Sequence, residues 1–264
     1  MVSYFSKIGH YPRRVQVELK FGRAGPPVNS TLAINVLAPR GDGHNQVLES
    51  PAMPKTRSAK ARAKKIRLLL FDVDGVMTDG KIFIFPAPAR SEQSMPAPAA
   101  NYADMGGFGL RSQTMIEAKG FHAHDGAAIS LARLGGIKTG LITKRISETV
   151  AVRARDLKLE HVYQGIQDKL SVFEDILRQE GMDSDEAGYV GDDVIDLPVM
   201  RNCGFAVAVA NARDEVKKEA DYVTRHNGGD GALRDAIEYI LRAQGKWQRA
   251  VSEYICERSP KARR

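Results

Sequence analysis

The chain has 264 residues, of which 43% are hydrophobic and 27% are charged, so it is long enough for one or two domains with a buried core. This composition excludes a fibrous or wholly disordered protein. No stretch approaches the roughly 18 apolar residues of a membrane-spanning helix, so we expect no membrane association. The two cysteines, Cys203 and Cys256, have no paired spacing, which indicates neither a disulfide framework nor a zinc site and fits a reducing cytoplasm.

The positive net charge of +7 belongs to the start of the chain. Residues 1–65 contain 12 Lys and Arg against three acidic residues, which leaves 27 basic and 29 acidic residues in the remainder. We find no sustained helical or strand period before Ile66, so residues 1–65 are interpreted as a basic, flexible N-terminal extension. An organelle presequence is the alternative. The run 55–65 has no interleaved aromatic residues, and we expect no nucleic-acid partner.

From residue 66 to residue 245, short apolar strands alternate with helical segments. This alternation predicts an α/β fold, a Rossmann-like parallel sheet with helices on both faces. A hairpin insertion after the first strand is predicted at 81–85 and 114–121, interrupted by a Pro/Ala-rich loop insert at 86–113. Residues 246–264 are expected to form a C-terminal tail. In chain order, we expect strands at 66–71, 138–143, 161–164, 186–191, 204–209 and 220–224, and helices at 127–134, 147–156, 169–180, 195–201, 214–218 and 232–243.

Four successive strand exits carry polar residues. The first strand is followed by Asp72 and Asp74, and the next ends in Thr143. Lys169 begins a helix after the third strand, and Asp192 follows the fourth. Each residue alone has an ordinary explanation as a turn, a helix cap or a solvated helix start. Ligands of parallel sheets bind at the carboxyl ends of the strands, so their joint order favours a functional site there. Neighbouring carboxylates are costly to hold together without a cation.

These motifs resemble those of the haloacid dehalogenase superfamily of phosphatases. The matching segments are DVDGV at 72–76, LIT at 141–143, Lys169 and GDDVID at 191–196. Further segments, among them FDVDGVMTDG, MIEAKGFHAHDG and NGGDGALRDAIEYIL, are similar to phosphatases of an eight-carbon sugar acid phosphate in lipopolysaccharide precursor synthesis. The similarity covers about residues 67–245. An alternative is a phosphatase of a nine-carbon acid phosphate of the sialic-acid type, and another is a non-catalytic sugar-binding relative of the fold.

The resemblance implies a role for each residue at the strand exits. Asp72 would be the nucleophile that forms an aspartyl-phosphate, and Asp74 the general acid and base. Mg²⁺ would be bound by Asp72, by the backbone carbonyl of Asp74 and by Asp192. Thr143 and Lys169 would contact the phosphoryl oxygens of the substrate, and the lysine would also offset charge in the transition state.

Other positions have less direct roles in this resemblance. Asp193 is expected to orient Lys169 or a metal-bound water rather than to ligate the metal, and Asp196 is either a supporting residue or a helix cap. Asp125 and Arg145 match positions near the sugar acid, although Asp125 could instead cap the following helix. Lys144 stands where the family usually has glycine, so substrate fit or activity could differ.

The spacing of the motifs leaves no room for a large cap domain. Between Thr143 and Lys169 there is space for one helix and one strand only. Phosphoryl transfer benefits from the exclusion of water, which a neighbouring subunit could provide. The resemblance implies a homotetramer with shared active sites, to which 114–121 would contribute a hairpin strand and 228–234 with the following tail a partner contact.

Overall fold

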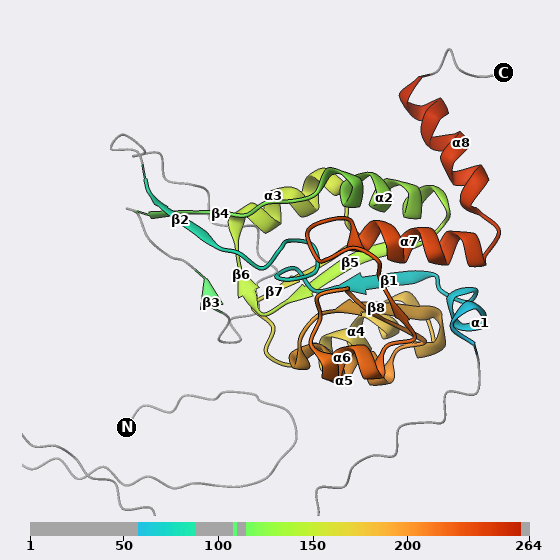
Figure 1. Ribbon diagram of the computed structural model, residues 1–264, viewed down its shortest axis with the longest axis horizontal. Coiled ribbons are helices and arrows are strands. Elements are labelled where there is room, and N and C mark those ends of the chain that lie inside the picture. The colour runs from blue at the N-terminus through green and yellow to red at the C-terminus, as the bar shows by residue number, and fades with distance from the viewer. Residues whose placement is uncertain (1–57, 88–107, 110–114, 260–264) are drawn as a thin grey trace, which may run out of the picture. The chain divides into compact units, whose positions relative to one another are not determined.

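The computed structural model describes residues 58–87, 108–109 and 115–259 (Figure 1). At its centre is a six-stranded sheet in the order β10-β9-β8-β1-β5-β7, and every strand pair in it is parallel. The predicted α/β fold with a parallel sheet is therefore confirmed. The strands are β1 (Leu68–Phe71), β5 (Lys138–Thr143), β7 (His161–Gln164), β8 (Ala187–Gly191), β9 (Phe205–Ala208) and β10 (Tyr222–Val223).

Helices cover both faces of this sheet. In Figure 1, α2 (Ala123–Leu134), α3 (Glu148–Leu157) and α7 (Ala232–Ala243) lie on one face. On the other face lie α4 (Lys169–Glu180), α5 (Leu197–Asn202) and α6 (Asp214–Glu219). Short 3₁₀ turns at Ser184–Glu186 and Val194–Asp196 flank β8. Because both faces are covered, β1 is wholly apolar and wholly buried.

α7 shows how the sequence pattern produces this packing. Its buried residues recur every three to four positions, which gives the helix one apolar side against the sheet. The buried apolar set is Ala232, Leu233, Ala236, Ile237, Ile240, Leu241 and Ala243. None of the helices within the described ranges combines the length and the hydropathy needed to cross a bilayer.

The hairpin after the first strand is present. β2 (Phe83–Pro86) and β4 (Met115–Ala118) form an antiparallel pair, with Phe83 opposite Ala118. Within the insert, β3 (Phe108–Gly109) pairs in parallel with β6 (Arg145–Ile146), so the insert returns to the loop after β5. Residues 88–107 and 110–113 of the insert lie outside the described part of the chain. Between Thr143 and Lys169, the structure contains only β6, α3 and β7, as expected for a fold without a large cap domain.

Two helices differ from the sequence-based expectation. α1 (Ala59–Ala63) lies inside the segment 1–65 that we expected to lack regular structure. It forms because Ser58 caps it by accepting from the Ala61 N–H at 3.3 Å, and because Ala63 is fully buried in the core. Residues 1–57 lie outside the described part of the chain. At the other end, α8 (Trp247–Arg258) occupies much of the expected tail and packs against α2 and α7.

Arg62 ties α1 to the sheet, and its removal tests that contact. Its guanidinium donates to the Gly204 carbonyl at 3.2 Å and forms an ion pair with the buried Asp221 at 3.0 Å. We expect Arg62→Ala to lower the free energy of unfolding by about 1–3 kcal/mol, because a buried carboxylate loses its cation. Urea denaturation measures this loss. The exposed Lys60→Ala on the same helix should change it by less than about 0.5 kcal/mol, and equal effects would contradict the assignment.

Candidate active site

The carboxyl ends of β1, β5 and β8 bring together residues from three distant parts of the sequence. These strands are parallel neighbours in the sheet, so their carboxyl ends lie at the same edge. Thr143 is the last residue of β5, and Asp72 and Asp192 directly follow β1 and β8. Asp72 and Thr143 are buried, and Asp192 is half-buried. The structure thus places them at the ligand-binding edge of a parallel sheet.

Lys169 is the centre of the polar network at this edge. Its ammonium group lies 2.8 Å from Asp72 Oδ2 and 2.8 Å from Asp196 Oδ1, and its side chain is only 1% exposed. The Tyr189 hydroxyl also donates to Asp196 Oδ1, at 2.9 Å. Lys169 can begin α4 at this point because Asp168 caps the helix, accepting from the Leu170 and Ser171 N–H groups. A buried lysine is therefore shared by two buried carboxylates.

The same carboxylates form a candidate site for a divalent cation. Oxygens of Asp72, Asp192 and Asp196 lie within 4.8 Å of one another. Both oxygens of Asp196 are already engaged, one by Lys169 and Tyr189 and the other by the Asp192 N–H at 3.0 Å. Asp192 Oδ1, by contrast, is buried and has no hydrogen-bond partner in the described part of the chain. Asp72 and Asp192 thus fit direct ligation of a hard cation, whereas Asp196 fits a supporting role.

Crowding changes the protonation of these groups. Burial raises the pKa of Asp72 to about 6, although the nearby Lys169 charge opposes this shift. Burial, followed by the charges of Asp196 and Asp72, raises the pKa of Asp192 to about 7. Burial by itself would lower the pKa of Lys169, but the two carboxylates outweigh it and raise that pKa. Without a cation, the acidic cluster therefore retains protons that ordinary carboxyls lose.

The glycine after Asp74 permits the close approach of the loop after β1 to Asp192. Gly75 has a φ of +93°, and a Cβ atom at this position would lie 2.2 Å from Asp192 Oδ2. A Cβ at Gly228 would in turn meet the Gly75 carbonyl oxygen at 1.6 Å. The neighbouring Gly229 N–H donates to the Val76 carbonyl at 3.0 Å. The loop after β1 is therefore fixed between β8 and the Gly228–Gly229 segment.

Asp74 belongs to a second network that sequence reasoning missed in part. Its carboxylate forms an ion pair with Lys119, and its Oδ2 lies 3.6 Å from Arg145 Nε. Glu117 binds Arg145 at 3.1 Å and accepts from the Ser147 hydroxyl at 2.6 Å. Glu117 and Lys119 are two positions apart, so a strand ending at 118 directs both to one face. This alternation could have indicated that Glu117 and Lys119 act together, but the sequence alone did not show that they contact Arg145 and Asp74.

Two of the expected residues have other partners. Asp193 is exposed and accepts from the Val194 N–H at 2.7 Å, and the ion pair to Lys169 comes from Asp196 instead. The 3₁₀ turn Val194–Asp196 accounts for this difference, because it returns Asp196 to the strand end. Asp125 accepts from the Arg234 and Gly231 N–H groups at 2.8 and 3.3 Å, so it binds the start of α7 rather than capping α2. Its contact with substrate stays a prediction.

Comparison with known proteins identifies the class of this fold and site. Residues 141–235 match the family of haloacid dehalogenase-like hydrolases. A relative from Escherichia coli (strain B / BL21-DE3) is 37% identical over 202 residues, which are 76% of this chain and 93% of the relative. The chain therefore belongs to the haloacid dehalogenase-like hydrolases and is a phosphoric monoester hydrolase. The E. coli relative is the 3-deoxy-D-manno-octulosonate 8-phosphate phosphatase KdsC.

Solved structures agree with this assignment. The same phosphatase from Yersinia pestis is 35% identical, with a TM-score of 0.60 over 72% of this chain and 88% of its own. The enzyme from Moraxella catarrhalis is 30% identical, with a TM-score of 0.61 over 74% of this chain and 97% of its own. That structure contains a magnesium ion, a phosphate ion and a KDO molecule.

The raised pKa values give a testable pH dependence for the metal-free protein. The pKa of Asp72 is about 6 and that of Asp192 about 7, both above the ordinary 3.8, so the folded state holds these protons more tightly than the unfolded chain. The protonated Asp72 and Asp192 therefore add to the free energy of unfolding. This contribution is fully present below about pH 4 and is lost as the pH rises through 6 and 7. Lys169 remains charged in both states over this range.

We therefore expect a divalent cation to raise the melting temperature more at about pH 8 than at about pH 5. Asp192→Asn removes one titrating group and one ligand, so it should reduce both the loss of stability with pH and the effect of the cation. Differential scanning calorimetry with cation or chelator measures both. An unchanged response in the variant would contradict the assignment of Asp192.

Proposed function

We propose that this chain is a Mg²⁺-dependent phosphatase that hydrolyses 3-deoxy-D-manno-octulosonate 8-phosphate to the free sugar acid and phosphate, in lipopolysaccharide precursor synthesis. The observation that carries this proposal is the contact of Lys169 with Asp72 and Asp196 beside the unpartnered Asp192 oxygen. The similarity to the named phosphatases supports the choice of substrate. The phosphatase domain of this proposal spans residues 66–245.

The acidic cluster fits Mg²⁺ as the cofactor. Asp72, Asp192 and the backbone carbonyl of Asp74 would hold the ion, since hard cations prefer oxygen ligands. When bound, the ion supplies positive charge that neutralises the carboxylates and the phosphoryl oxygens. The unpartnered Asp192 oxygen and the raised pKa values of Asp72 and Asp192 support this assignment, because both indicate a missing positive charge.

The chain's own residues would perform the reaction in two steps. In the first, Asp72 attacks phosphorus, the bond from phosphorus to the sugar oxygen breaks, and Asp74 gives a proton to that oxygen. In the second, Asp74 takes a proton from water, which attacks phosphorus and releases phosphate and the Asp72 carboxylate. Lys169, which is 2.8 Å from Asp72 Oδ2, would contact the phosphoryl oxygens, as would Thr143 at the end of β5. The Lys119 contact with Asp74 orients its carboxyl group.

The other end of the substrate would be recognised near the second network. Arg145 is suited to a carboxylate because its planar guanidinium offers paired donors. It lies between Asp74 and Glu117, so a group bound there would stand close to the acid and base of the reaction. We place the reaction in the cytoplasm, consistent with two free cysteines in the described residues.

We further propose that the protein is a homotetramer with shared active sites, assembled through the hairpin. Phe83, Ile84 and Phe85 on β2 are 48%, 50% and 47% exposed, and Ile116 on β4 is 47% exposed. A strand with apolar side chains exposed on both faces favours cover by another chain. Because β4 also carries Glu117 and leads to Lys119, assembly through this hairpin would support the residues around Asp74.

Substitution of the nucleophile tests the proposed reaction. Asp72→Asn should lower phosphate release at least about a thousandfold, because an amide cannot form the phosphoryl ester. Phosphate release is measured over eight- and nine-carbon sugar acid phosphates, with Mg²⁺ or a chelator. Asp175→Asn, on the exposed side of α4, is the matched control and should keep full activity. Activity in Asp72→Asn would contradict the nucleophile, and preference for a nine-carbon acid would contradict the substrate.

Assembly is tested on the exposed apolar strand. Phe83→Asp combined with Phe85→Asp should shift the sedimentation coefficient to that of a smaller species, because each charge removes an aromatic contact worth about 1.5–3 kcal/mol. Val152→Asp is the control, since this residue is also exposed but lies on α3. A fully active wild-type monomer would refute the tetramer, and an unchanged double variant would exclude the hairpin as the interface.

A further inference from the structure

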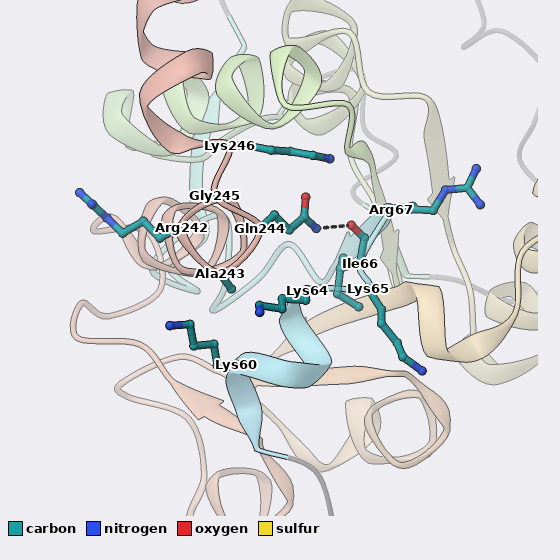
Figure 2. Close-up of a pocket in the computed structure, with 10 residues that line it drawn as sticks. All are labelled: Lys60, Lys64, Lys65, Ile66, Arg67, Arg242, Ala243, Gln244, Gly245 and Lys246. Atoms are coloured by element: carbon teal, nitrogen blue, oxygen red, sulfur yellow. Dashed lines mark hydrogen bonds between the residues drawn. The ribbon is translucent and has the colours of Figure 1, made fainter.

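A basic pocket lies at the opposite end of β1 from the active site. It is a cavity of about 680 Å³ between α1 and the turn that joins α7 to α8 (Figure 2). β1 begins at Leu68, next to this pocket, and ends at Phe71, directly before Asp72. The pocket is therefore separate from the catalytic edge of the sheet. Six of its lining residues are cationic and none is acidic: Lys60, Lys64, Lys65, Arg67, Arg242 and Lys246.

The two sides of the pocket are fixed to each other. The Gln244 side-chain amide donates to the Ile66 carbonyl at 2.6 Å and to the Ala63 carbonyl at 3.3 Å, as Figure 2 shows for the first of these bonds. Ile66 and Ala63 are fully buried in the core. The cations of α1 and those of the α7–α8 turn therefore line two sides of one open pocket. Its volume lies in the range of about 300–1,000 Å³ that is typical of small-molecule sites.

Half of these cations lack a counter-charge. Lys65 pairs with Asp185 at 2.7 Å, Arg67 with Glu186 at 2.8 Å, and Arg242 with Glu238 at 2.7 Å. In the part of the chain that the structure describes, the ammonium groups of the other three make no ion pair: Lys60, Lys64 and Lys246. Figure 2 places Lys60 and Lys64 on the α1 side and Lys246 on the facing side. Gathered like charges repel one another and attract an anion.

The favourable placement of cations at helix carboxyl ends accounts for only part of this set. It applies to Arg242, in the last turn of α7, and to Lys60 and Lys64, in the last turn and at the C-cap of α1. Lys246 closes the end of α7, where its N–H donates to the Leu241 carbonyl at 2.8 Å, but it is also the N-cap residue of the 12-residue helix α8, where the helix dipole favours negative charge. A cation at that position is consistent with an anion bound beside it. The cluster also contrasts with the remainder after residue 65, in which acidic residues outnumber basic ones.

One further atom in the pocket lacks a partner. Gln244 Oε1 is buried and accepts no hydrogen bond in the described residues, while its amide nitrogen is fully used. Lysine ammonium groups bind phosphates as point charges. We propose that this pocket binds a small anion with a chain of phosphate groups, contacted by Lys60, Lys64 and Lys246. An inorganic polyphosphate and a nucleoside triphosphate share this chemistry.

The chain contains a single tryptophan, which reports on this pocket. Trp247 follows Lys246 directly, and its ring lies 5.0 Å from the guanidinium carbon of Arg242. Inorganic triphosphate and ATP are each titrated into the full-length protein in the presence of a chelator, and Trp247 fluorescence is recorded. Isothermal titration calorimetry gives the same dissociation constants independently of the fluorophore. We expect saturable binding that weakens as salt is added.

Variants connect the binding to the three lysines. Lys60→Gln, Lys64→Gln and Lys246→Gln together should raise the dissociation constant about tenfold or more, because the unpaired charges are gone. Lys158→Gln, Lys217→Gln and Lys218→Gln together remove the same charge elsewhere and should leave it within about twofold. Circular dichroism confirms that both triple variants fold. Asp72→Asn should bind as the wild type does, since the catalytic edge is not involved.

Each outcome decides the proposal. Equal affinity for triphosphate and ATP supports the phosphate chain as the whole ligand, whereas tighter ATP binding supports a nucleotide. Absence of saturable binding in the wild type overturns the proposal. So does an unchanged dissociation constant in the pocket variant, or an equal loss in the control variant. Loss of the signal in Asp72→Asn would assign the binding to the active site instead and overturn it as well.

Discussion

The arrangement of the active site depends on one buried lysine between two buried carboxylates. Lys169 compensates Asp72 and Asp196, because its ammonium group lies 2.8 Å from a carboxylate oxygen of each. The third acid, Asp192, has an oxygen without a hydrogen-bond partner among the described residues, and burial raises its pKa to about 7. One lysine therefore does not balance three carboxylates. The remaining negative charge is the physical reason why a divalent cation fits here, beside the carboxylate of Asp72 that we propose as the nucleophile.

The parallel sheet places these groups without the help of a dedicated domain. Each strand contributes a side chain at its carboxyl end, and the neighbouring registers of β5, β1 and β8 bring these ends together. Gly75 then permits the loop after β1 to touch Asp192, which a larger residue would prevent. Because the covering helices bury β1 on both faces, the groups at the edge are held in a water-poor environment, where their interactions are stronger than at the surface.

The hairpin connects the chemistry to the proposed assembly. One side chain of its second strand, Glu117, binds Arg145 and Ser147, and the following Lys119 binds Asp74. The outer positions of the same hairpin are apolar and exposed. A contact with another subunit at the outer positions would therefore restrict the strand that supports Asp74. This is a structural route by which oligomer formation and catalysis would depend on each other in an enzyme without a large cap domain.

The sequence by itself determined the order of strands and helices, the parallel sheet and the residues at its strand exits. These features are local: an apolar run of four to six residues ends, and the next residue is at the sheet edge. The tertiary structure alone decided which side chains meet. It paired Lys169 with Asp196 rather than Asp193, because a 3₁₀ turn returns the later residue to the strand. It also directed Asp125 to α7, more than a hundred positions away.

The same distinction holds at the two ends of the described region. α1 is only five residues long, too short to be stable by its own hydrogen bonds, and it forms because Ala63 is buried and Arg62 reaches Asp221. No pattern within residues 59–63 encodes these contacts. The basic pocket exists for the same reason, since its lysines come from segments about 180 positions apart that only folding brings together. The hydrophobic periodicity of the sequence predicts whether a residue is buried or exposed. Which residue it contacts depends on the packing of the whole chain.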